Sequence, residues 1–88
     1  MAQTVAQVLT AATDSVTLIN GVNGGTHYVG SKTQAQINEM VQQNVDHLTT
    51  ILSYDSSMEG VPNIADASDD KSSYTTAITT GNAYIAAH

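Results

Sequence analysis

The sequence of 88 residues predicts one small all-α domain of three helices, with a long amphipathic helix in the middle. Apolar residues recur every three or four positions in three stretches of the chain, which is the spacing of one face of a helix. Segments rich in glycine, asparagine and serine separate these stretches, and such residues are typical of turns and loops.

The first helix is expected over residues 4–20. Thr4 and Gln7 fit the capping-box pattern, in which the two side chains accept hydrogen bonds from each other's backbone N–H groups at a helix N-terminus. Gly21 follows as a C-terminal stop, because glycine readily adopts the left-handed conformation in which many helices end.

Residues 16–29 allow a second interpretation, a short hairpin. Two runs, 16–19 and 26–29, flank Asn-Gly and Gly-Gly pairs, which are hairpin-turn signals. The apolar residues of the first run do not alternate as a half-buried strand requires, so we prefer a helix followed by a loop over 21–30.

The second helix is expected over residues 31–54, and its amphipathic pattern is the clearest in the chain. Ser31 and Gln34 again fit a capping box. Its apolar residues form a stripe along one helix face that is wide enough to form the core of this chain, to bind a helix of another chain, or both. Its apolar members are Ile37, Met40, Val41, Val45, Leu48, Ile51 and Leu52.

A loop over 55–67 and a third helix over 68–86 complete the expected fold. Gly60 and Pro62 interrupt helical structure in the loop. Gly81 lies inside the helical pattern of the last stretch, where glycine is unfavourable. We therefore expect either a break at Gly81 or the close approach of a neighbouring backbone.

Net charge excludes two classes of partner. The chain carries a formal charge of −6, and Lys32 and Lys71 are its only lysines or arginines. Binding to phosphate backbones requires several such side chains, so we expect no nucleic acid as a partner. The same shortage argues against an anionic membrane surface. No apolar run approaches the length of a transmembrane helix, and the N-terminus lacks the pattern of a signal peptide, so we expect a soluble protein.

No motif for catalysis, a cofactor or a metal stands out. Cysteine is absent, and none of His27, His47 and His88 is spaced to share a helix face with another. The acidic residues at 55–70 lack the spacing of a calcium loop; Asp69 and Asp70 instead favour the first turn of the third helix. We expect a non-enzymatic protein without a cofactor.

The composition favours protein partners. Val, Ile, Leu, Met and Tyr number 25 in total, few for an independent core, whereas 32 residues are Thr, Ser, Asn or Gln. Desolvating a neutral polar surface costs little free energy, so we expect self-association or a place in a larger assembly. The residues expected at an interface are Met40, Leu48, Tyr28, Tyr54 and Tyr84.

The Thr- and Ala-rich, charge-poor texture of the chain, seen best over residues 75–88, resembles that of small bacteriophage virion proteins. The resemblance lies in composition and involves no specific motif. It implies a structural subunit of a capsid, neck or tail. The alternative function is an acidic soluble adaptor or inhibitor that binds a basic partner protein, although the acidic residues are spread along the chain.

Overall fold

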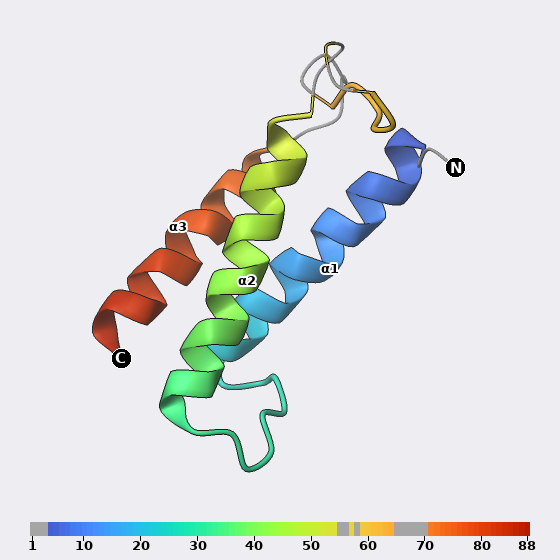
Figure 1. Cartoon of the computed structure of the whole chain (residues 1–88). Helices are drawn as coiled ribbons and strands as arrows, with labels where there is room; N and C mark the ends of the chain where they lie inside the picture. The colour runs from blue at the N-terminus through green and yellow to red at the C-terminus, as the bar shows by residue number, and fades with distance from the viewer. Residues whose placement is uncertain (1–3, 55–56, 58, 65–70) are drawn as a thin grey trace.

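Three helices pack side by side in the computed structural model, which describes residues 4–54, 57, 59–64 and 71–88. They are α1 (Val5–Gly24), α2 (Gln34–Leu52) and α3 (Ser72–Ala87). Consecutive helices run in opposite directions, and each helix contacts the other two (Figure 1). The described residues contain no strand, so the prediction of an all-α three-helix domain is confirmed and the hairpin at 16–29 is wrong.

Helix α1 begins as expected but ends later. The Thr4–Gln7 capping box is present, with both backbone-to-side-chain hydrogen bonds formed. Gly21 does not stop the helix, which continues to Gly24 and ends at Gly25 in the left-handed conformation (φ 79°). Several glycines follow one another here, and the one that adopts positive φ defines the helix end.

Helix α2 begins two residues later than the Ser31–Gln34 pair indicated. Its capping box is formed by Thr33 and Gln36, with Thr33 N donating to Gln36 Oε1 at 2.9 Å and Gln36 N donating to Thr33 Oγ1 at 3.2 Å. The reason lies in the preceding turn, where Gly30 has φ 61° and Lys32 N donates to the carbonyl of Val29. Ser31 belongs to that turn, so it is not free to cap the helix.

Replacing the N-cap tests this assignment. Thr33→Ala removes the side-chain acceptor for Gln36 N and should lower the free energy of unfolding by about 1 kcal/mol. Ser31→Ala is the matched control, because Ser31 is exposed, and it should change stability by less than about 0.5 kcal/mol. Urea denaturation of the three proteins measures both values. A larger loss for Ser31→Ala than for Thr33→Ala would contradict the assignment.

The core lies along the common axis of the three helices. Most of the apolar stripe predicted for the second helix faces this core, so it is buried inside the chain. Ile64, from the segment between α2 and α3, closes one end of the core and is fully buried. The buried apolar residues are Val8, Ala12, Ile19, Val22, Ile37, Val41, Val45, Leu48, Ile51, Ile64, Tyr74 and Ala77.

Helix α3 passes through Gly81 without a break. Gly81 is buried, and a Cβ placed there would lie 2.5 Å from Val45 Cγ2 and 3.3 Å from Val41 Cγ1. The expected close approach therefore exists, but the neighbour is a side chain of α2 and not a backbone. The described part of α3 begins at Ser72; the predicted start near residue 68, with Asp69 and Asp70, lies outside the described residues.

Candidate interaction surface

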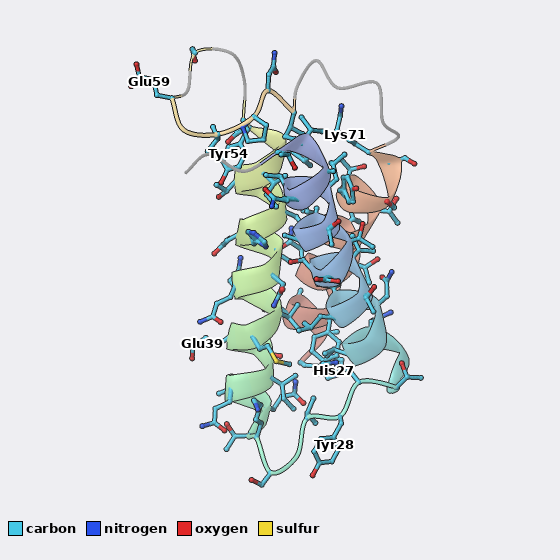
Figure 2. All side chains as sticks on the ribbon, turned by 90° about the vertical axis from the view of Figure 1, so that its right-hand side faces the viewer. His27, Tyr28, Glu39, Tyr54, Glu59 and Lys71 are labelled. Atoms are coloured by element: carbon cyan, nitrogen blue, oxygen red, sulfur yellow. The ribbon has the colours of Figure 1, made fainter. Side chains whose placement is uncertain are left out.

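The two ends of the bundle carry different side chains. We define the loop end by the last turns of α1 and α3, the first turn of α2 and the α1–α2 loop, residues 25–33. His27 and Tyr28 lie at the loop end, whereas Tyr54, Glu59 and Lys71 lie at the opposite end (Figure 2). We call this opposite end, where α2 ends and α3 begins, the far end.

The α1–α2 loop is fixed to the bundle on both sides of Tyr28. The carbonyl of Gly21 accepts hydrogen bonds from Thr26 N at 2.8 Å and from His27 N at 3.1 Å. The His27 side chain packs so closely on Gly21 that a Cβ there would lie 3.0 Å from His27 Cβ. On the other side, Val29 is half-buried and packs against the core.

This anchoring leaves Tyr28 pointing outward. Its side chain is 90% exposed, and it is the one large hydrophobic side chain that is exposed among the described residues. Figure 2 shows it projecting from the loop. Its neighbour Gly30 has positive φ, and a Cβ there would lie 3.7 Å from Tyr28 Cε1. The structure thus presents an aromatic ring to solvent from a loop whose flanking residues are held in place.

Tyr84 also belongs to the loop end but has partners within the chain. Its hydroxyl accepts a hydrogen bond from Gln34 Nε2 at 3.0 Å, which ties the end of α3 to the start of α2. Its ring stacks on His88 with centroids 4.1 Å apart and an interplanar angle of 23°. Tyr84 is half-buried, so part of its side chain is covered by this chain and the rest is open to solvent.

The other residues expected at an interface do not join this surface. Leu48 is fully buried in the core, because it occupies the inward position of α2, so its assignment to an interface in the folded chain is corrected. Met40 is half-buried along α2. Tyr54 is half-buried at the far end, where its carbonyl accepts a hydrogen bond from Ile64 N at 2.9 Å. The five residues therefore do not form one patch, and only Tyr28 and Tyr84 share an end.

Ser15 and His47 form a contact that the sequence did not reveal. Ser15 is 3% exposed on the inner face of α1, and its Oγ lies 3.0 Å from Nδ1 of the exposed His47 on α2. The hydroxyl gains a partner and the two helices gain a polar link. Because Ser15 is almost fully buried, the contact lies within the packing of α1 against α2. The sequence indicated only that Ser15 is buried, because it lies among the apolar positions of α1, and gave no sign of its partner.

Three kinds of feature are absent from the described ranges: a metal-binding cluster, a pocket and a membrane-spanning helix. No group of three or more His, Asp or Glu side chains there is arranged to hold a metal ion. No pocket is found in the part of the chain that the structure describes. None of the described helices is both long and apolar enough to cross a membrane.

Threonine hydroxyls along the outer faces are satisfied by their own helices. Thr10, Thr13 and Thr17 of α1 each donate to the carbonyl four residues earlier, at 2.9 to 3.0 Å. Thr79 of α3 does the same, at 3.2 Å. Removing water from these exposed side chains costs little free energy, because each hydroxyl already donates to a backbone carbonyl.

Comparison with known proteins does not extend these observations. No protein-family model matches the chain, and no similar curated protein or solved structure was found.

Proposed function

We propose that this chain is a non-enzymatic interaction subunit of a larger protein assembly, and that Tyr28 is an anchor of its interface. The exposed ring of Tyr28 carries the proposal. A tyrosine that is 90% exposed on a fixed loop leaves most of its apolar area in water. Rigid aromatic side chains are frequent among the residues that dominate binding energy, since ordering them costs little entropy.

The outer faces of the helices support an assembly role. They carry few charged side chains and are rich in threonine, and several threonine hydroxyls are already bonded to backbone carbonyls. Such a surface can be covered by other chains with a small desolvation penalty. The resemblance in composition to small bacteriophage virion proteins makes a virion the assembly that we propose.

The described helices offer no concentrated acidic face for the alternative role, an acidic adaptor. The acidic side chains on the described helices are Asp14 on α1 and Glu39 and Asp46 on α2. Asp46 already accepts a hydrogen bond from Gln42 Nε2 at 2.9 Å. Three separated carboxylates make a poor match for the concentrated positive patch of a basic partner.

The proposal is tested by removing the anchor and following the chain in its native background. In extracts of the cells or particles that contain the chain, the natural protein should sediment with a large complex at constant stoichiometry. Tyr28→Ala should shift most of the protein to the free fraction, because an aromatic anchor contributes about 2 kcal/mol or more to binding. Density-gradient sedimentation with quantitative mass spectrometry of each fraction measures the distribution.

Ser31→Ala is the matched control, since Ser31 is exposed in the same loop and its replacement should leave sedimentation unchanged. Thermal denaturation should show that Tyr28→Ala folds normally, because a side chain exposed to this degree contributes little to the core. A natural chain that sediments as a free monomer would make the proposal wrong.

A further inference from the structure

We infer that Asn23, in the last turn of α1, is a site of spontaneous deamidation, and that this reaction releases the loop that carries Tyr28. The chain contains two Asn-Gly pairs, Asn20–Gly21 and Asn23–Gly24, and both lie in α1. The pairs share the same chemistry but differ in their surroundings, and these surroundings assign the reaction to the second pair.

The reaction needs only water in addition to the chain. The backbone nitrogen of the glycine attacks the side-chain carbonyl carbon of the asparagine, and a cyclic succinimide forms as the side-chain nitrogen leaves as ammonia with the proton of the attacking N–H. Water then opens the ring at either carbonyl, which gives aspartate or isoaspartate. Glycine is the most favourable second residue, because it has no Cβ to hinder closure of the ring.

A closed helix protects both pairs from this reaction. Each backbone N–H in a helix is bonded to the carbonyl four residues earlier, so the attacking nitrogen is held away from the asparagine side chain. The reaction therefore proceeds only while a turn is open, and its rate scales with the fraction of time for which that turn is open. The pair in the less stable turn should react faster.

The turn that contains Asn20–Gly21 is held closed by contacts with the core and the loop. The next residue, Val22, is buried in the core. The carbonyl of Gly21 accepts hydrogen bonds from Thr26 N at 2.8 Å and from His27 N at 3.1 Å. Opening this turn would expose an apolar side chain and disturb both hydrogen bonds.

The turn that contains Asn23–Gly24 lacks this support. Asn23, Gly24 and Gly25 are all exposed, and a Cβ placed at either glycine would meet no described atom within 4 Å. The hydrogen bond from Gly25 N to the carbonyl of Val22 is long, at 3.3 Å. Helix ends fray first, and two consecutive glycines gain much conformational entropy on opening. This turn should therefore open more often than the one before it.

Deamidation of Asn23 changes both the charge and the path of the chain. The new carboxylate lies at the C-terminal end of α1, where the helix dipole disfavours negative charge. Isoaspartate also adds one carbon atom to the main chain, so Thr26 N and His27 N lose their alignment with the carbonyl of Gly21. These two hydrogen bonds fix one side of the loop, and without them Tyr28 is no longer held in place.

Incubation of the purified full chain in mildly alkaline buffer, with and without a denaturing concentration of urea, tests the assignment. Tandem mass spectrometry locates each new acid and distinguishes aspartate from isoaspartate. In the native chain Asn23 should convert at least about tenfold faster than Asn20. In urea the two rates should agree within about twofold, because each asparagine follows a β-branched residue and precedes a glycine.

Two variants serve as controls. Gly24→Ala keeps the fold, because nothing described lies near the added Cβ, and it should slow conversion of Asn23 at least about tenfold while Asn20 is unaffected in urea. Asn23→Asp adds the charge without the extra carbon atom. It should therefore loosen the loop less than isoaspartate does.

The isoaspartate form, separated by chromatography, tests the release of the loop. Amide hydrogen exchange at Thr26 and His27 should be at least about tenfold faster than in the natural chain, and exchange at Leu48 in α2 should rise less. One consequence rests on the proposed function: a loose Tyr28 must be ordered on binding, which lowers affinity. In the extract experiment, isoaspartate should therefore be enriched in the free fraction over the assembled one.

Three results would overturn the inference. Equal conversion of Asn20 and Asn23 in the native chain would show that the last turn of α1 is no less stable than the one before it. Conversion of both in urea and of neither in the native chain would show that the last turn stays closed. Unchanged exchange at Thr26 and His27 in the isoaspartate form would show that the loop remains fixed. A chain that deamidates as described but sediments as a free monomer would instead contradict the proposed function and leave this site in place.

Discussion

Leu48→Ala should lower the free energy of unfolding by about 2–5 kcal/mol, which is a large fraction of the stability of a domain of this size. Leu48 is fully buried on α2, and Val45 and Ile51 flank it on the same inner face. Truncation removes apolar area from the core and leaves a cavity that three packed helices close only in part. Urea denaturation followed by far-ultraviolet circular dichroism measures the loss.

Gln43→Ala is the matched control on the same helix. Gln43 is exposed, and alanine is the better helix former, so stability should stay within about 0.5 kcal/mol of the natural value. The two variants together also test whether the apolar stripe of α2 packs in the core of this chain or at an interface with another chain. A Leu48→Ala protein that is as stable as Gln43→Ala but no longer assembles would return Leu48 to an interface and contradict the core described above.

The parts of the fold that depend on neighbouring residues were predictable from the sequence. The spacing from Ile37 to Leu52 reports one helix face, because side chains three and four apart lie on the same side of a helix. The Thr4–Gln7 capping box was predictable for a similar reason, since its hydrogen bonds join residues three positions apart. All-α character therefore followed from the pattern of each segment alone.

Helix ends were less predictable, because several residues of the right type compete there. Gly21, Gly24 and Gly25 are all suitable stops, and the choice of Gly25 depends on where the following loop meets the bundle. Ser31 and Thr33 each have a glutamine three residues later. Only the turn closed between Val29 and Lys32 determines that the second pair forms the cap.

The candidate site was predictable in part. The sequence indicated Tyr28, Tyr54 and Tyr84 equally as interface residues, since all three lie in a loop or near a helix end. Their exposure depends on contacts between distant segments, such as the one between Gln34 and Tyr84, which are 50 positions apart. The contact of Ser15 with His47, 32 positions apart, is hidden from the sequence for the same reason.

Gly81→Ala should destabilise the fold, although alanine is the better helix former by about 1 kcal/mol. The new methyl group would lie 2.5 Å from Val45 Cγ2, with Val41 Cγ1 at 3.3 Å and Ile19 Cγ2 at 3.4 Å behind it. Val45 is 4% exposed, and its branched side chain has few alternative rotamers, so α3 must move away from α2. Overpacking of this kind costs about 1–3 kcal/mol, which exceeds the gain in propensity.

Two further substitutions separate overpacking from any general effect of replacing glycine. Gly24→Ala, at the end of α1, has no neighbouring atom within 4 Å of the added Cβ, so it should be neutral or slightly stabilising. Val45→Ala alone should cost about 2 kcal/mol, because it removes two buried methyl groups and leaves a void. In the Gly81→Ala, Val45→Ala double variant the new methyl group enters that void. Its loss should therefore be smaller than the sum of the two single losses by about 1 kcal/mol or more. Strictly additive losses in urea denaturation would show that α3 does not approach α2 at Gly81 as closely as the structure describes.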